Sequence, residues 1–198
     1  MAFNPKHILV IDWETSGAEF GVDVEIIASK YQGISFGAII ADFNTLEEVE
    51  SVYCEVKFND AAYIWSPEAE AIHGKSREML LADGLSSEGA AEVLANLIVR
   101  YWGFESLVIF AGHNPYFDIA FTKQLLEPFG VMPKLHHVVL DTSALGMILI
   151  GKHRSDEVFD LLGGIQKRKE HNALDDARAC LQSMQNAKLI FNEVLADG

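Results

Sequence analysis

Hydrophobic and polar positions along the chain follow two periods. The aliphatic run at residues 8–11 is typical of a buried strand, and further strands are predicted over residues 34–41 and 50–58. The turn at 42–48 is short enough to pair these two strands in antiparallel fashion. The beginning of the chain therefore predicts a three-stranded meander that includes the first strand.

Most of the remaining apolar residues recur at helical spacing. Helices are predicted from Pro67 to Gly74 and over residues 87–102, 115–129, 142–150, 156–163 and 174–195, with short strands at 107–111 and 138–140. Residues 16–33 have no clear period and predict a long loop. The apolar stripe of the last helix comprises Ala177, Leu181, Met184, Ala187, Phe191 and Val194. This order predicts an α/β fold, a mixed five-stranded sheet covered by helices.

The composition is that of a soluble globular protein. The 198 residues, 49% hydrophobic and 22% charged, suit one domain over residues 1–198. The sequence contains no membrane-spanning apolar run and no signal peptide, so we expect a cytoplasmic protein. Cys54 and Cys180 have neither zinc nor disulfide-framework spacing and are expected to be buried thiols.

The formal net charge of −14 limits how the chain could bind nucleic acid. A protein that grips long nucleic acid through a broad surface needs that surface to be basic. A nucleic-acid substrate would therefore be short, or held mainly by its end.

Two carboxylates lie at the end of the first predicted strand. Asp12 and Glu14 are two residues apart, so they point to the same side of the strand. Two negative charges beside a core are costly unless a cation lies between them, and hard divalent cations take oxygen ligands. The alternative is a solvated turn with no metal.

A second acidic position follows the predicted strand at 107–111. In the stretch 112–118, which contains His113 and Asn114, Asp118 would lie in the first turn of a helix. Ligand sites in α/β sheets gather at the carboxyl ends of strands, where helix amides are also available. The alternative is a first-turn acid that only complements the helix dipole.

A third polar stretch, residues 170–177, opens the final helix. Asp175 and Asp176 point in different directions on a helix, so only one of them can share a site with His171. A histidine in the preceding loop can act as a general base, since its pKa lies near neutrality.

Taken together, the three stretches resemble a known family. Asp-x-Glu, His-Asn-x-x-Phe-Asp and His-x-Ala-x-x-Asp-Ala, in this order, are similar to the motifs of the DEDDh (DnaQ-like) 3′-to-5′ exonucleases. That family includes the polymerase III epsilon subunit, RNase T and oligoribonuclease. The resemblance implies an RNase H-like fold with two Mg²⁺ ions, which Mn²⁺ can replace. It makes His171 the general base and assigns the metal to Asp12, Glu14, Asp118 and Asp176.

The resemblance also implies a substrate and its contacts. Members release nucleoside 5′-monophosphates from the 3′ ends of single-stranded DNA or RNA or from short oligonucleotides. Ser66–Gly74 looks like a family segment whose histidine lies near the terminal nucleotide, so His73 is either a substrate contact or a packing residue. Trp13 either stacks on the terminal base or turns into the core. The candidate substrate contacts are Trp13, Thr15, His73, His113 and Asn114.

Other features leave alternatives open. Ser35 stands where many relatives carry glutamate, so a contact of that glutamate would be lost. The run Lys167–Lys169, with Lys152, His153 and Arg154, is either a clasp for phosphates or a solvated loop. The chain could instead be a proofreading-type or non-catalytic subunit that binds a polymerase or another protein. All five catalytic positions are filled, which argues against a non-catalytic member. A homodimer is plausible because several standalone relatives pair.

Overall fold

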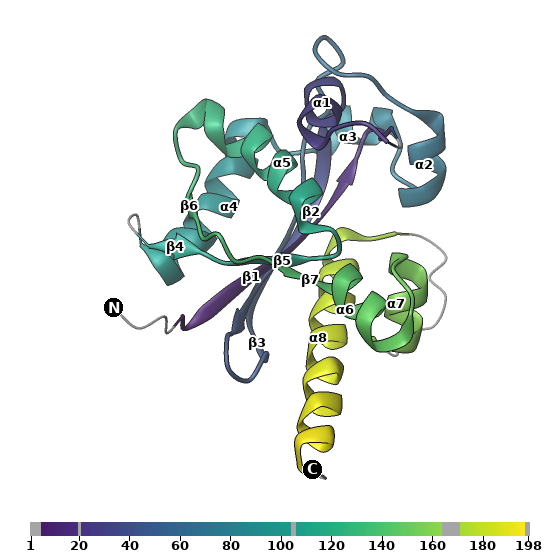
Figure 1. Cartoon of the computed structure of the whole chain (residues 1–198). Coiled ribbons are helices and arrows are strands. Elements are labelled where there is room, and N and C mark those ends of the chain that lie inside the picture. The colour runs from purple at the N-terminus through teal and green to yellow at the C-terminus, as the bar shows by residue number, and fades with distance from the viewer. Residues whose placement is uncertain (1–4, 20, 104–105, 164–170, 197–198) are drawn as a thin grey trace.

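A mixed five-stranded sheet forms the centre of the computed structural model, which describes residues 5–19, 21–103, 106–163 and 171–196 (Figure 1). Its strand order is β3-β2-β1-β5-β7. The strands β1 (His7–Thr15), β2 (Gly33–Asp42) and β3 (Glu48–Glu55) are antiparallel, whereas β5 (Phe110–Gly112) and β7 (Leu140–Asp141) run parallel to β1. The predicted meander and mixed sheet are confirmed.

The predicted strand at 107–111 is wrong in its extent. The chain forms β4 (Leu107–Val108) and then β5, and these two pieces belong to different sheets. β4 pairs with β6 (Lys134–Leu135), which the sequence analysis missed, and β5 pairs with β1 and β7. The predicted strand at 138–140 is shifted to Leu140–Asp141. These pieces are too short to carry a readable alternation.

Helices cover both faces of the sheet. One core cluster packs β1 and β2 against α1 (Val24–Lys30), α4 (Ser87–Trp102) and α5 (Pro115–Leu126), and a second packs the other face against α7 (Ser155–Leu161) and α8 (Ala173–Ala196). α6 (Thr142–Ile150) lies beside α7 and α8 (Figure 1). Alternation along β1 sends Leu9 and Ile11 to the first core and Ile8 and Val10 to the second.

The elements between the sheet and α4 are short. α2 (Pro67–His73) begins at its N-cap Ser66 and ends at Gly74, whose left-handed backbone (φ 68°) suits glycine, as predicted. α3 (Arg77–Asp83) follows and was not predicted. Later in the chain, α5 is followed by the 3₁₀ turn η1 (Glu127–Phe129), and the two together make up the segment predicted as one helix over residues 115–129.

The predicted loop at 16–33 contains a helix, α1. The Asp23 side chain accepts a hydrogen bond from the backbone N–H of Glu25 and so caps this helix. The side-chain amide of Gln124 donates to the carbonyls of Ala28 and Tyr31 and thereby fastens the segment to α5. Seven residues are too few for a helical period to emerge from sequence, so these tertiary bonds decide the structure.

Helix α8 starts directly on β2. A Cβ atom added at Gly37 would lie only 2.2 Å from the Cα of Leu174, so only glycine permits this approach. Gly37 is also the cross-strand partner of Asp12. The glycine therefore brings the beginning of α8 next to the end of β1.

The far end of α8 departs from the prediction. Its stripe is buried from Ala177 to Ala187, but Phe191 and Val194 are 44% and 66% exposed because the helix extends past the sheet (Figure 1). Within the described residues, no helix combines the length and the hydropathy needed to cross a membrane. Cys54 and Cys180 are both buried, as expected, and neither is in a disulfide.

Candidate active site

The three predicted stretches meet in one pocket. Its volume is about 230 Å³. It is lined from β1, α5, α7, α8 and the adjoining loops by Asp12, Trp13, Glu14, His113, Asn114, Phe117, Asp118, Ser155, Phe159, His171 and Asp176. Residues up to 164 positions apart in the sequence thus share one site, and all five predicted catalytic residues are among them.

The two carboxylates of β1 face helix α8. Asp12 and Glu14 alternate with core residues of the opposite face and lie beside Gly37 and Ser35 of β2. Glu14 is only 8% exposed, and Ser35 is fully buried. Glu14, Ser35 and Glu55 are cross-strand neighbours on β1, β2 and β3. Because the middle residue is serine, Glu14 has no acidic neighbour on β2, and Glu55 on β3 pairs with Lys75 at 2.8 Å.

Asp118 lies in the first turn of α5, as predicted. Its Oδ1 accepts a hydrogen bond of 2.9 Å from the backbone N–H of Trp13, the residue between Asp12 and Glu14. Burial raises the pKa of Asp118 well above its usual range, against the lowering effect of its backbone hydrogen bonds, and the charges of Glu14 and Asp141 raise it further. Ionised Asp118 is thus costly here unless a cation accompanies it.

The opening turn of α8 supplies the fourth carboxylate. Asp176 is 3% exposed, and its Oδ2 lies 3.2 Å from Nδ1 of His171. The backbone N–H of His171 donates to the carbonyl of Ile72, which anchors the loop on α2. The side chain of Asp175 is 68% exposed, so the two acids point in different directions, as predicted.

The donor set suits a divalent cation. Glu14, His171 and Asp176 each offer a ligand atom, and these three atoms lie within 4.8 Å of one another. Asp12 and Asp118 line the same pocket and add further carboxylate oxygens, the ligands that Mg²⁺ and Mn²⁺ prefer. A cation would also offset the repulsion that raises the pKa of Asp118.

The indole of Trp13 turns into the core. It is 5% exposed, its Nε1–H donates to Oγ1 of Thr122 at 3.1 Å, and its ring packs on Phe36. Of the two alternatives for Trp13, this geometry supports packing over base stacking. Thr15 is also buried; its hydroxyl donates to the carbonyl of Gly17, and it does not line the pocket. A substrate contact by Thr15 stays a prediction.

His113 and Asn114 join neighbouring elements. The ring nitrogens of His113 lie 3.0 Å from Oγ1 of Thr142 and 2.9 Å from the carbonyl of His153, which ties α6 and the start of α7 to the end of β5. Asn114 is the N-cap of α5 in the left-handed conformation (φ 56°), and its backbone N–H donates to Oδ1 of Asp141. Both line the pocket, and their contact with substrate stays a prediction.

His73 is buried near His171 without lining the pocket. Its Nδ1 accepts a hydrogen bond from the backbone N–H of Lys75, so the neutral ring carries its proton on Nε2. Burial lowers its pKa to about 4, and the charges of Lys75 and His171 contribute. His73 is therefore a neutral, well-packed side chain, and its role as a substrate contact stays a prediction.

Some residues of the site were not predicted from the sequence, among them Asp141, Ser155 and Phe159. Asp141 accepts the Asn114 hydrogen bond and raises the pKa of Asp118. Its place at the end of β7, parallel to β5, was the available signal, because such strand ends meet at one edge. Ser155 and Phe159 reach the pocket from α7, and no sequence signal marked them.

The predicted basic patch falls partly outside the described residues. Lys167, Arg168 and Lys169 lie in the segment that the structure does not describe. Nζ of Lys152 lies 2.8 Å from Glu157, an exposed pair within one loop and helix. The phosphate clasp stays a prediction.

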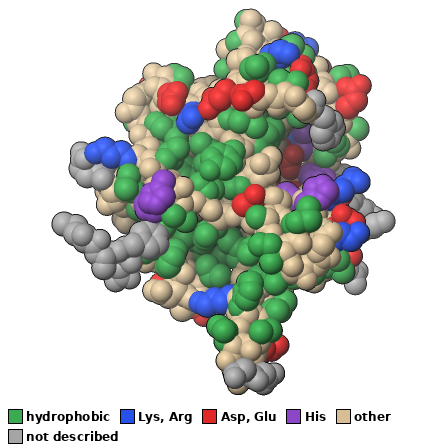
Figure 2. Space-filling view, in the orientation of Figure 1, with side chains coloured by type: hydrophobic (Ala, Val, Ile, Leu, Met, Phe, Trp, Pro, Cys, Tyr) green, Lys and Arg blue, Asp and Glu red, His purple; other side chains and the backbone are tan. Residues whose placement is uncertain are grey.

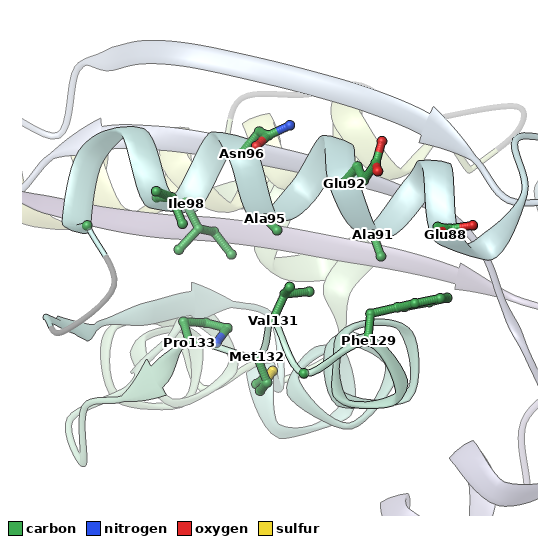
Figure 3. Close-up of a pocket in the computed structure, with 13 residues that line it drawn as sticks. Glu88, Ala91, Glu92, Ala95, Asn96, Ile98, Phe129, Val131, Met132 and Pro133 are labelled. Carbon is green, nitrogen blue, oxygen red and sulfur yellow. The ribbon is translucent and has the colours of Figure 1, made fainter.

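A larger cavity of about 480 Å³ lies elsewhere, between α4 and residues 129–133 (Figure 3). Its walls are mostly apolar, and Figure 3 shows Ala91 and Ala95 of α4 opposite Val131. The charged residues that line it are Glu88 and Glu92. Two acids on one side of an apolar cavity do not form a metal cage, so size alone does not identify the site.

A comparison with protein families gives one match over most of the chain. The RNase T family model, described as an exonuclease family, matches residues 9–184. No curated protein sequence matches the chain significantly.

Solved structures show the same fold. Escherichia coli exonuclease I bound to a dT13 oligonucleotide superposes with a TM-score of 0.70 at 18% identity, over 94% of this chain and 41% of that one. Exonuclease I from Methylocaldum szegediense gives 0.69 at 22% identity, over 96% and 43%. A zinc-bound complex of the E. coli enzyme with single-stranded DNA gives 0.71 at 18% identity, over 98% and 43%. The chain thus spans less than half the length of these relatives and shares the RNase H-like fold of the part it matches.

Proposed function

This chain belongs to the RNase T family of exonucleases, and on that premise we propose that it removes nucleoside 5′-monophosphates stepwise from the 3′ end of single-stranded nucleic acid. The convergence of Glu14, His171 and Asp176 within 4.8 Å carries the proposal, since these residues come from opposite ends of the chain. Residues 1–198 act as one exonuclease domain in this proposal, because both cores share the same sheet.

The four carboxylates are proposed to hold the metal. Asp12, Glu14, Asp118 and Asp176 would bind two Mg²⁺ ions, or Mn²⁺ in their place. Bound there, such ions polarise a phosphodiester and lower the pKa of a water molecule. Divalent-metal use is common to exonucleases of this type, and the buried, mutually repelling carboxylates support it here. The identity and number of the ions are part of the proposal.

His171 is proposed as the general base. Because Oδ2 of Asp176 lies 3.2 Å from Nδ1, a proton on Nδ1 is held by that carboxylate and the Nε2 lone pair is presented as the base. Nε2 would then take the proton of the attacking water as the phosphodiester bond breaks. The 31% exposure of the His171 side chain gives it a route to pass the proton to solvent.

Single-stranded DNA is the substrate we propose to test first. The exonuclease I structures hold single-stranded DNA oligonucleotides. The net charge of −14 favours a substrate held by its end over one gripped along its length. RNA belongs in the same test, because sugar preference depends on contacts to the 2′-hydroxyl.

A direct test uses 5′-labelled single-stranded DNA and RNA of several lengths. We expect a ladder that shortens from the 3′ end with Mg²⁺ or Mn²⁺, stops with EDTA, and is absent for Asp12→Ala. A 3′-phosphate on the same oligomer should block the ladder, which establishes the polarity. If the folded wild-type protein degrades none of these substrates with either metal, the proposal is wrong and the subunit alternative becomes the better one.

A further inference from the structure

The proposed general base is anchored on a helix that is itself weakly packed. The backbone N–H of His171 donates to the carbonyl of Ile72, in the last turn of α2. Of the seven residues of α2, all within the described part of the chain, His73 alone is buried. So short a helix is not stable by itself, and one buried side chain adds little packing. The position of His171 therefore depends on what holds α2 in place.

The first end of α2 is fastened to strand β1. Ser66, the N-cap of the helix, donates its backbone N–H at 2.7 Å to the carbonyl of Ser16, which directly follows β1. The hydroxyl of Ser16 donates to the carbonyl of Ile64 and accepts a bond from the backbone N–H of Gln32. Ser16 is fully buried. This end of the helix is thus fixed to the sheet.

The other end of α2 is fastened to strand β3 by a buried ion pair. Nζ of Lys75 lies 2.8 Å from Oε1 of Glu55, and the two side chains are 10% and 29% exposed. The hydroxyl of Tyr53 donates to the same oxygen at 2.7 Å, and the ammonium lies 5.2 Å from the centre of the Tyr53 ring. The backbone N–H of Lys75 donates to Nδ1 of His73. The pair therefore connects β3 with the last turn of α2.

Both groups of this pair are charged at neutral pH. Burial lowers the pKa of Lys75, but its hydrogen bonds with Glu55 and Tyr53 outweigh burial and raise the pKa above its ordinary value. Burial raises the pKa of Glu55, but its hydrogen bonds with Lys75 and Tyr53 bring the pKa below its ordinary value. Charge-assisted bonds are stronger than neutral ones, so this contact is a firm one.

The pair lies beside the metal site without belonging to it. Glu55 is the cross-strand neighbour of Ser35, which is the neighbour of Glu14. Adjacent strands are about 4.8 Å apart, so Glu55 lies roughly 10 Å from Glu14 across the sheet. Neither Lys75 nor Glu55 is among the described residues that line the pocket. Figure 2 shows histidine and acidic side chains recessed between the parts of the molecule that contain α2 and α7. The pair can thus act on the site through α2 without touching a metal ligand.

We propose that the pair of Lys75 and Glu55 positions His171, by holding the last turn of α2 where the Ile72 carbonyl can bind the His171 backbone. The start of α8 is fixed on β2 at Gly37, so a movement of α2 breaks this bond and does not carry His171 along. The catalytic part of the inference rests on the proposed function, in which His171 is the general base. Lys75 and Glu55 are positioning residues in it.

Hydrogen exchange of the His171 amide, measured by NMR without metal, tests the positioning directly. In Lys75→Met we expect this amide to exchange about 3–10 times faster than in the wild type, as loss of one hydrogen bond does. Amides in β1 should keep their wild-type rates, which shows that the protein is folded. Arg77→Met on α3 is the matched control and should change neither. Arg77 makes the same two kinds of contact, with Asp60 at 2.7 Å and over the Phe58 ring, away from α2.

Glu55→Gln is a second variant, on the more exposed side of the pair. It breaks the same ion pair, so we expect the same faster exchange of the His171 amide. Glu55→Gln combined with Lys75→Met should be no worse than either change alone, because residues that act as one unit are not additive. Effects that add would overturn the pair as a single anchor.

Steady-state kinetics test the link to catalysis. We expect kcat to fall about 3–10-fold in Lys75→Met while KM changes little. The dissociation constant for Mn²⁺, measured by calorimetry, should stay within about threefold, because all four carboxylates are present. An amide rate equal to that in Arg77→Met overturns the anchor, and faster exchange with unchanged kcat overturns its role in positioning the base. The amide readout needs no activity, so failure of the proposed function would appear separately, as a wild type that degrades no oligonucleotide.

Discussion

The backbone N–H of Trp13 donates a hydrogen bond of 2.9 Å to Oδ1 of Asp118, 105 positions later in the sequence. Because Trp13 lies between Asp12 and Glu14 in the sequence, this bond holds the Asp118 carboxylate beside the part of β1 that carries the first two. Strand β1 and helix α5 are therefore joined at the point where the proposed metal would bind. The bond forms only if the Trp13 backbone keeps its position on β1, and the buried indole holds it there.

Asp118→Asn should stabilise the metal-free protein while abolishing activity. The amide keeps an oxygen to accept the Trp13 hydrogen bond and removes a charge that burial and neighbouring acids make costly. We expect the free energy of unfolding in EDTA at neutral pH to rise by about 0.5–2 kcal/mol. Thermal unfolding measures this, and Asp160→Asn, an exposed acid on α7, is the matched control.

The stabilisation expected from Asp118→Asn should depend on pH in a definite direction. The folded-state pKa of Asp118 is raised above the ordinary value of 3.8, so the folded state binds the proton more tightly than the unfolded state. Wild-type stability from this group is therefore lost as the pH rises from about 4 through the folded-state pKa. The gain from Asp118→Asn should grow over that range and shrink when Mg²⁺ is added. A gain that is independent of pH and metal would contradict the electrostatic cause.

Trp13→Phe distinguishes the two roles considered for this side chain, packing in the core and stacking on the terminal base. Loss of indole volume and of the buried bond to Thr122 should destabilise the protein by about 1–3 kcal/mol. The KM for oligonucleotides should change little, because the ring faces the core. Thermal unfolding and steady-state kinetics together measure both effects. A large rise in KM with unchanged stability would instead support base stacking.

Gly37→Ala should displace the beginning of α8. The new methyl group would overlap the backbone of Leu174, and backbone cannot move aside as a side chain can. We expect a loss of about 1–3 kcal/mol in unfolding free energy and a loss of activity beyond it, since Asp176 follows Leu174 by two residues in the first turn of α8. Thermal unfolding and activity at a temperature where the variant is folded measure the two effects.

Gly89→Ala is the control for that substitution. Its Cβ would lie 3.3 Å from the flexible Ser86 hydroxyl, and alanine favours helix, so stability should stay within about 1 kcal/mol. A Gly37→Ala variant that behaves like this control would show that the contact between β2 and α8 does not position the site.

Much of the fold was predictable because long elements carry a clear period. The aliphatic run of β1 and the sixteen residues of α4 left little choice of structure. Short elements were not predictable, because tertiary contacts decide them. α1 depends on Gln124, and β4 and β5 differ only in the neighbour with which they pair. The apolar stripe of α8 correctly predicted which side of the helix is buried. It could not predict that the helix extends past the sheet, which leaves Phe191 exposed.

The site was predictable where residue type and spacing determine the chemistry. Two acids in alternation on β1 had to share a face. The same pattern left two alternatives open for Trp13, and only its contacts with Phe36 and Thr122 in the structure place the indole in the core. Asp141 escaped notice because β7 is only two residues long. The bonds from His113 to Thr142 and His153 depend on how α6 and α7 pack, which no local pattern encodes.

The most direct test of the account compares two adjacent acids at the start of α8. Asp176 faces the pocket beside His171, whereas Asp175 is exposed. With 5′-labelled single-stranded DNA and Mg²⁺, Asp176→Asn should slow release of the 3′-terminal nucleotide at least about 100-fold, and Asp175→Asn should leave it within a few-fold of wild type. Equal rates for the two variants, with both proteins folded, would contradict the proposed catalytic site.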